Sequence, residues 1–365
     1  MRDDTYIERL ISVVTHITCM ARKPYRVELT YPKNRKAQYF LVKDVSVKGK
    51  RRKARKYLGT KQPTAEEVDK YRREYAYEIE LKAAQKKAEI SCSFYNPVYL
   101  SQEEMRQIEE IRYIYKTFTD LLTTNEIEVY EMNFEVNYVQ GTTSIEGNTL
   151  SLKEAYDLLI YSISPKNKSL REINEIQNFK SVKEYRDKNR GKVTIDFIKT
   201  LHTFIMNNID LESAGVFRRI DDLGILGCDI RIAPSIAIEK ELSEIIDRYY
   251  TNIDNGKYPF EEAVLFHYNF EIIHPFTDGN GRVGREVFNY MLNKSGYPRL
   301  LFLGDDRESY IKSLQLGNEK KYHEMVRAFV NLVISQRLRI LKNNLRKVVI
   351  PPKKIGQLRL TDFYL

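Results

Sequence analysis

Apolar residues recur three and four positions apart along most of the chain beyond residue 100, a spacing that places them on one face of an α-helix. Glycine, proline, serine and asparagine separate these segments and are typical of helix ends and turns. The periodic segments are 101–122, 125–139, 151–163, 169–187, 193–208, 238–253, 260–273, 282–294, 307–317 and 320–345. The pattern predicts a mainly α domain over residues 96–340.

One stretch inside this helical region has a different pattern. Residues 214–234 combine glycines with β-branched residues, which predicts a short β-hairpin between two helices. An ordinary connecting hairpin would satisfy the pattern by itself.

The first 95 residues form a separate region. Residues 25–31 and 39–47 alternate apolar and polar side chains as β-strands do, and a turn at residues 47–50 leads into a basic run. Thr64 and Glu67 have the spacing of a capping box for a long charged helix that ends near residue 88. We therefore expect a small basic α+β module over residues 1–95.

Charge is concentrated in this N-terminal module. The chain of 365 residues carries a formal net charge of +10, and residues 1–95 hold 23 Lys and Arg against 12 Asp and Glu. Basic strands with interspersed tyrosines suit the phosphate backbone of nucleic acid. A solvated face or a surface for an acidic protein fits the same charge equally well, because charge alone specifies no partner.

The strongest chemical signal is the segment 274–285, whose sequence is His-Pro-Phe-Thr-Asp-Gly-Asn-Gly-Arg-Val-Gly-Arg. Its glycines fall between two helical segments, where the unpaired N–H groups and positive dipole end of the second helix attract anions. His274 is a suitable general base, and Asp278 is a ligand that Mg²⁺ accepts. Arg282 and Arg285 lie three apart on one helical face and can bind phosphate. The segment predicts a polyphosphate site.

This segment resembles the motif of the Fic (filamentation-induced-by-cAMP) family, H-P-F-x-[D/E]-G-N-G-R-x-x-R, at every fixed position. A looser resemblance extends from about residue 105 to residue 332. The resemblance implies a mostly helical enzyme that uses Mg²⁺ and transfers the nucleoside monophosphate of ATP, or of a related nucleotide, to a protein hydroxyl. The catalytic and nucleotide-binding residues that it implies within the motif are His274, Asp278, Gly279, Asn280, Gly281, Arg282 and Arg285.

The resemblance gives each of these residues a role. His274 would take the proton of the acceptor hydroxyl, and Asp278 would hold Mg²⁺. Asn280 and the backbone N–H groups at Gly279 and Gly281 would bind the α-phosphate as negative charge builds there. The two arginines would bind the outer phosphates.

A second segment resembles the inhibitory motif of Fic proteins, [S/T]-x-x-x-E-[G/N]. Residues 142–148 match it with Thr142 and Glu146 at the diagnostic positions. A carboxylate at Arg285 would neutralise the guanidinium meant for the γ-phosphate, so autoinhibition is the expected resting state. The alternative is an exposed turn, since Gly147 and Asn148 are good turn residues.

The family resemblance also suggests two further features. The hairpin of residues 214–234 corresponds to a flap that positions the target by backbone pairing. Tyr310 and Asn318 resemble the residues that flank the adenine, although they could equally be a core aromatic residue and a helix cap. His267 is expected in the core, and His202 and His323 receive no role.

The last 25 residues, 341–365, predict an extended tail with a peptide motif. Gln357, Leu360, Phe363 and Tyr364 occupy the four defining positions of the PIP box, Q-x-x-[ILM]-x-x-[FY]-[FY], which binds the sliding clamp PCNA. One helical turn would present the three apolar side chains together as a plug. Alternatively, the tail folds back onto the body and the aromatic side chains join its core.

Cysteine usage and hydropathy bear on location. Cys19, Cys92 and Cys228 are too few and too scattered for a disulfide framework or a zinc site, which favours a reducing, cytoplasmic setting. No apolar run reaches membrane-spanning length, so no membrane partner is expected.

The expected function is Mg²⁺-dependent AMP transfer to a protein, restrained by Glu146 and tethered to PCNA through the tail. The same site could instead remove AMP from a modified protein or use another donor, such as UTP or CDP-choline. A protein of a different class, an adaptor for the clamp or for nucleic acid, is a further alternative, and a homodimer stays open.

Overall fold

The computed structural model describes residues 25–33, 36–221 and 232–349. The chain divides into two compact units, Met1–Ile90 and Ser91–Leu365. The PIP-box-like residues and the centre of the predicted hairpin, residues 222–231, lie outside the described residues. No helix among the described residues is both long enough and apolar enough to cross a bilayer.

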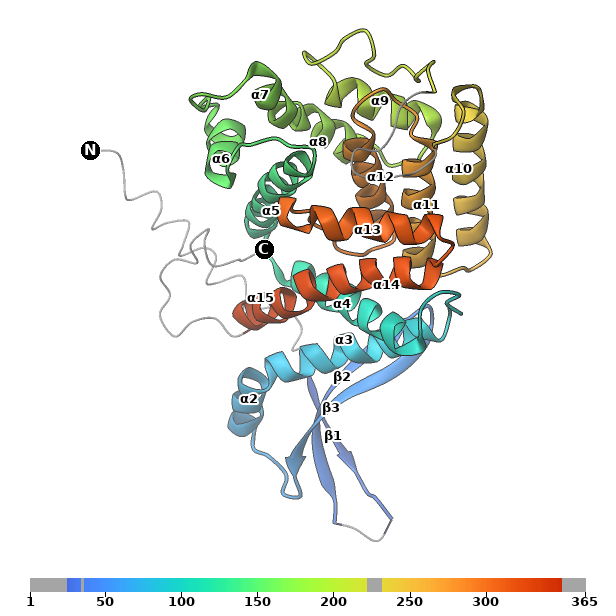
Figure 1. The fold of residues 1–365 in the computed structure, drawn as a ribbon. Coiled ribbons are helices and arrows are strands. Elements are labelled where there is room, and N and C mark those ends of the chain that lie inside the picture. The colour runs from blue at the N-terminus through green and yellow to red at the C-terminus, as the bar shows by residue number, and fades with distance from the viewer. Residues whose placement is uncertain (1–24, 34–35, 222–231, 350–365) are drawn as a thin grey trace, which may run out of the picture. The chain divides into compact units, whose positions relative to one another are not determined.

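The N-terminal unit contains an antiparallel sheet with the strand order β1-β2-β3 (Figure 1). The strands are β1 (Arg26–Thr30), β2 (Gln38–Val47) and β3 (Lys50–Gly59). Lys48 and Gly49 join β2 to β3 with φ of 45° and 81°, the left-handed geometry of a two-residue hairpin turn. The basic run that the sequence placed after this turn is a strand in its own right, paired with β2 along its length.

In the described part of this unit, two helices follow the sheet. The capping box forms as predicted, with Thr64 N–H donating to Glu67 at 2.7 Å and Glu67 N–H donating to Thr64 Oγ1 at 3.2 Å. The predicted single helix is interrupted at Tyr75, giving α2 (Ala65–Glu74) and α3 (Ala76–Cys92). Glu80 of α3 binds the strand region, because Lys43 Nζ donates to its carboxylate at 2.6 Å and a tyrosine hydroxyl does so at 2.8 Å.

Part of the basic charge of this unit is neutralised within it. Glu28 pairs with Lys53 at 2.7 Å and with Arg55 at 2.6 Å, and Arg26 pairs with Asp44. Lys50–Lys53 at the start of β3 are exposed.

The second unit is helical wherever it is described as regular structure. Four of the helices described in this unit open with capping boxes, each formed by a serine or threonine and a glutamate three residues later, at Ser101, Thr123, Ser151 and Ser169. Its α-helices are α4 (Gln102–Leu121), α5 (Thr124–Ile145), α6 (Leu152–Tyr161), α7 (Leu170–Gln177), α8 (Phe179–Lys188), α9 (Ile195–Ile205), α10 (Ile238–Asp254), α11 (Pro259–Ile273), α12 (Asn280–Lys294), α13 (Arg307–Asn318), α14 (Tyr322–Val333) and α15 (Arg339–Val349). The fold class is thus mainly α, with a small sheet in the N-terminal unit.

Three helices differ from the periodicity that predicted them. The helix expected to end at residue 139 continues as α5 to Ile145 and so carries the first part of the inhibitory motif. The segment 169–187 forms two helices that meet at Asn178, whose amide donates to the carbonyls of Ile205 and Asn207. A π-helical turn, Ile334–Leu338, separates α14 from α15.

The centre of the helical unit is the pair α11 and α12, which pack against each other (Figure 1). Nearly every residue of both helices is buried, including the charged residues Arg282, Arg285 and Glu286 of α12. The segment between them, residues 274–279, is the predicted phosphate loop. The core therefore holds this loop at both of its ends.

Candidate active site

His274 lies at the point where α11 ends. Its backbone has φ 48° and ψ 61°, a left-handed conformation that is strained for a residue with a side chain. Arg218 stabilises this geometry, because its Nε donates to the His274 carbonyl at 2.7 Å and its backbone N–H donates to the Pro275 carbonyl at 2.9 Å. Burial lowers the pKa of His274, which keeps the imidazole neutral and able to accept a proton.

Asn280 closes the loop after His274. Its amide bonds Phe276 in both directions: Oδ1 accepts from the Phe276 N–H at 2.8 Å, and Nδ2 donates to the Phe276 carbonyl at 2.7 Å. The Asn280 side chain therefore shapes the loop. The predicted contact of this residue with the α-phosphate stays a prediction.

His202, which received no role from the sequence, supports the same loop from α9. Its ring stacks on Phe276 with centroids 3.7 Å apart and planes 4° from parallel. Nδ1 accepts from the Gly215 N–H at 2.8 Å, so Nε2 carries the proton and donates to the Asp278 carbonyl at 3.0 Å. Burial lowers the pKa of His202 to about 4, and the ring is therefore neutral. The sequence around His202 does not predict this role, because the residues that it contacts lie far from it along the chain.

The first turn of α12 faces a cavity of about 680 Å³. Gly279 precedes the helix with φ 77°, and the first N–H groups of a helix have no partner within it. A Cβ on Gly281 would lie 2.4 Å from Glu146 Oε1, so the carboxylate can approach only because this residue is glycine. The cavity is lined by Ser144, Ile145, Glu146, Gly147, Arg171, Glu175, Glu271, His274, Thr277, Asp278, Gly279, Asn280, Gly281, Arg282, Arg285, Arg307, Tyr310, Ile311 and Leu314.

Asp278 presents a carboxylate to this cavity. Burial opposes its ionisation, but Arg282 and Arg171 outweigh burial and lower the pKa of Asp278, so the carboxylate is charged. Across the described ranges no three Asp, Glu, His or Cys side chains converge into a metal cage. Mg²⁺ is commonly held by one or two carboxylates together with substrate phosphates, so the ionised carboxylate of Asp278, facing the cavity, fits this ion.

Arg285 is buried and already has partners. Its Nη2 donates to Glu146 Oε1 at 2.6 Å and to the Thr142 carbonyl at 2.9 Å, and its Nε donates to Thr142 Oγ1 at 2.8 Å. The side chain of Arg285 is 1% exposed and that of Glu146 is 37% exposed. The structure thus brings the two residues of the predicted inhibitory motif onto the second arginine of the phosphate motif.

The far wall of the cavity is formed by α13. Tyr310, Ile311 and Leu314 line it, and the Tyr310 hydroxyl bonds Nε2 of the buried His267 at 2.9 Å. His267 lies in the core as expected. Asn318 is exposed and is not among the lining residues; it accepts a hydrogen bond from a tyrosine hydroxyl of α11 instead.

Glu271, Arg171 and Glu175 are among the lining residues that received no role from the sequence. Glu271 is buried on α11, and burial raises its pKa to about 7. Arg171 and Glu175 lie one turn apart on α7, more than a hundred residues before Arg282. Both are ordinary charged residues of an amphipathic helix, so only their position in space marks them.

The two flanks of the predicted flap are tied to this region. The backbone N–H of Arg218 donates to the Pro275 carbonyl, and the backbone N–H of Ala233 donates to the Ile272 carbonyl at 3.1 Å. The described flanks are not strands, and the part between them lies outside the described residues.

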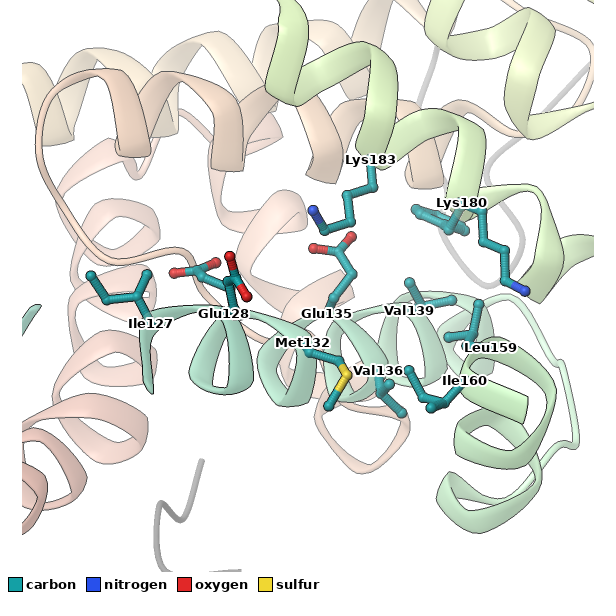
Figure 2. A pocket seen from close by; sticks show the side chains of 12 residues that line it. Ile127, Glu128, Met132, Glu135, Val136, Val139, Leu159, Ile160, Lys180 and Lys183 are labelled. Atoms are coloured by element: carbon teal, nitrogen blue, oxygen red, sulfur yellow. The ribbon is translucent and has the colours of Figure 1, made fainter. Parts of the chain in front are cut away.

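A separate hollow of about 380 Å³ lies between α5, α6 and α8 and shares no lining residue with this cavity. Figure 2 shows its apolar lining from α5 and α6, which includes Met132, Val136, Val139, Leu159 and Ile160. Its walls contain no residue of the segment 274–285.

Residues 192–292 match the model of the Fic/DOC family. The protein adenylyltransferase fic-1 of Caenorhabditis briggsae is 31% identical over 186 residues, which are 50% of this chain and 36% of the relative. The protein adenylyltransferase Fic of Aedes aegypti is 25% identical over 237 residues, covering 63% of this chain and 46% of the relative. The chain thus spans less than half the length of these curated relatives.

Solved structures give the same fold. A Fic-domain-containing signaling protein from Bacteroides thetaiotaomicron superposes with a TM-score of 0.55 at 24% identity, covering 66% of this chain and 96% of that chain. A fragment of Fic-1 from Caenorhabditis elegans gives a TM-score of 0.56 at 22% identity, covering 78% and 86%. At these identities the likeness concerns the fold alone, which is that of Fic domains.

Proposed function

We propose, from the premise of a Fic/DOC domain over residues 192–292, that this chain transfers AMP from ATP to a hydroxyl side chain of a protein. The observation that carries the proposal is one cavity that holds a half-buried histidine whose pKa is lowered, an ionised aspartate and two arginines around the start of a helix. The relatives named protein adenylyltransferase support the same activity.

The chemistry is a displacement at the α-phosphorus of ATP. The hydroxyl oxygen of the target forms a bond to this phosphorus while the bond to the bridging oxygen of the β-phosphate breaks, and pyrophosphate leaves. His274 accepts the proton of the attacking hydroxyl. The N–H groups in the first turn of α12 face the charge that develops on the α-phosphate oxygens.

Asp278 would hold Mg²⁺ in this reaction. The ion, when bound, neutralises the charge of the pyrophosphate that leaves. Arg282 and Arg285 would bind the same leaving group, since guanidinium groups match phosphate oxygens in geometry and charge.

Glu146 restrains this activity in the proposal. Its carboxylate holds the buried Arg285 at 2.6 Å, so a γ-phosphate must compete with it for the guanidinium. ATP would then bind in a pose that does not react until the segment of Glu146 moves.

Incubation with α-labelled ATP, Mg²⁺ and a cell lysate tests the proposal. Glu146→Gly should label itself or a target protein well above wild type, and Glu146→Gly with His274→Ala should label nothing. Undiminished labelling without His274 would refute the general-base role. If Glu146→Gly transfers no label but wild type removes AMP from a modified protein, the site is a hydrolase that needs Glu146.

We also propose that the C-terminal tail binds the sliding clamp PCNA. The support is the PIP-box pattern of Gln357, Leu360, Phe363 and Tyr364, which lies outside the described residues. Calorimetry of PCNA with the full chain should give a complex on the micromolar scale, since three apolar side chains bury only a few hundred Å². Phe363→Ala with Tyr364→Ala should abolish it without changing self-labelling. Absence of heat for the intact chain at tens of micromolar would refute the tether.

A further inference from the structure

Four charged side chains at the edge of the nucleotide cavity form a closed ring of ion pairs. Arg171 Nη2 lies 2.5 Å from Asp278 Oδ2, and Arg171 Nε lies 3.2 Å from Glu175 Oε1. Arg282 contacts the same two carboxylates, with Nη2 3.0 Å from Asp278 Oδ1 and Nη1 3.3 Å from Glu175 Oε1. Two guanidiniums and two carboxylates therefore neutralise one another where the outer phosphates of a nucleotide would lie.

The ring is anchored to the segment that carries Glu146. Asn148, two residues after Glu146, donates through Nδ2 to Glu175 Oε2 at 2.9 Å and to the Glu172 carbonyl at 2.9 Å. Thr149 Oγ1 donates to Glu172 Oε1 at 2.6 Å. The same short turn thus holds one carboxylate on Arg285 and, through α7, a second carboxylate on Arg282.

We infer that Glu175 is a second internal competitor for the phosphates, acting on Arg282 as Glu146 acts on Arg285, and that Arg171 occupies the carboxylate of Asp278 that a cation needs. This inference rests on the proposed nucleotide site and adds to it a restraint that neither the inhibitory motif nor the phosphate motif contains. Binding of a magnesium nucleotide then requires α7 to release both residues.

Burial makes this competition effective. The side chains of Arg282 and Glu175 are 1% and 8% exposed, so their pairing is weakly screened by solvent. The Arg171 side chain is 55% exposed, which leaves it free to swing away once a cation takes its place beside Asp278. Since Asn148 links α7 to the turn after Glu146, departure of Glu146 and opening of the ring are coupled movements.

Binding of a non-hydrolysable ATP analogue with Mg²⁺, measured by calorimetry, tests the inference apart from catalysis. Glu175→Gln keeps the size of the side chain and its bond to Asn148 but removes the charge. On the Glu146→Gly background we expect Glu175→Gln to tighten the analogue by about fivefold, the effect of losing one competing ion pair. Glu184→Gln, an exposed residue of α8, is the matched control and should change nothing.

Arg171→Gln tests the other half of the ring. Because Arg171 no longer competes at Asp278, half-maximal binding of the analogue should need about fivefold less Mg²⁺. Arg190→Gln, an exposed arginine away from the cavity, serves as its control. Thermal unfolding of each variant checks that the fold is retained, and the exposed Arg171 keeps this arm informative if Glu175→Gln folds poorly.

The outcomes separate the ring from the proposed function. Unchanged or weaker analogue binding in Glu175→Gln, with an unchanged Mg²⁺ requirement in Arg171→Gln, would overturn the inference and make the ring a positioning device for Arg282. If both effects appear but no variant transfers label, the inference about the ring is supported and the proposed AMP transfer is refuted. If Glu146→Gly transfers label and neither Glu175→Gln nor Arg171→Gln changes binding, the proposed AMP transfer is supported and the inference about the ring is refuted.

Discussion

The reactivity of His274 depends on where its side chain is held. A strained left-handed backbone, fixed by Arg218, sets the imidazole at the edge of the cavity, and burial lowers its pKa. A base whose pKa is lowered stays unprotonated at a lower pH than an exposed histidine does. In the proposed function, the pH dependence of AMP transfer therefore follows from this residue and its surroundings.

We predict that kcat/KM for AMP transfer by Glu146→Gly stays level as the pH falls through about 6.5, the ordinary pKa of histidine, and declines only in more acidic solution. The pH–rate profile with a fixed protein substrate measures this. His323→Ala, at an exposed histidine, should leave the profile unchanged. A half-maximal point at or above the ordinary value would contradict the burial argument.

Arg285 should contribute to AMP transfer only when Glu146 does not occupy its guanidinium. In Glu146→Gly the guanidinium can reach the γ-phosphate, so we expect Arg285→Ala to cancel the gain in labelling that Glu146→Gly produces. In wild type, where Glu146 already occupies the guanidinium, the same substitution should change the low basal labelling little. A quantitative gel assay of the four variants gives the coupling directly. Additive effects would mean that the two side chains act independently.

At the scale of elements, the loop is positioned by the close packing of α11 and α12. Gly284 of α12 lies against α11 so tightly that a Cβ there would be 2.3 Å from Glu271 Oε1 and 2.9 Å from a ring carbon of Phe270. Neither neighbour can move easily, because both are buried. The helix that supplies both arginines is thus held by contact at a glycine.

We predict that Gly284→Ala lowers the free energy of unfolding of the helical unit by about 1–3 kcal/mol, the usual cost of overpacking. It should also reduce labelling on the Glu146→Gly background, because α12 must shift. Urea unfolding and the labelling assay measure the two effects. Gly191→Ala is the control, since its nearest neighbour is a side-chain atom of Asn189 at 3.3 Å in a surface turn. Equal stability of the two variants would refute the packing argument.

At the scale of the whole molecule, buried ion pairs connect distant parts of the helical unit. Glu135 of α5 binds Arg186 of α8 at 2.9 Å and Arg299, which follows α12, at 2.8 Å. Burial would raise the pKa of Glu135, but the two arginines outweigh burial and lower it to about 2. A carboxyl group with a lowered folded pKa stabilises the fold above its unfolded pKa and loses this contribution as the pH falls through the folded value.

We predict that Glu135→Gln costs about 3–5 kcal/mol at neutral pH, because two buried guanidiniums lose a shared partner. The difference from wild type should shrink as the pH falls from about 4.5 towards about 2. Urea unfolding at several pH values measures it. Glu128→Gln, an exposed neighbour on the same helix, should behave as wild type at every pH. A difference that does not depend on pH would show that the charge of Glu135 is not the cause.

The sequence alone determined the features that depend on neighbours along the chain. The capping box at Thr64 was readable because a hydroxyl and a glutamate three residues apart bond across a single turn. The motif at residues 274–285 was readable because its histidine, glycines and arginines all fall within twelve residues of sequence. Tertiary contacts alter such local bonds little.

The tertiary structure alone decided which distant residues meet at the loop. Glu146 reaches Arg285 across 139 residues of sequence, and the motif suggested this pairing only through a family resemblance. His202 and the ring members Arg171 and Glu175 carried no pattern at all, because each sits on an ordinary amphipathic helix. The packing of α7 and α9 around the start of α12 brings them to the cavity, and such packing depends on the shape and burial of whole helices, which no local spacing encodes.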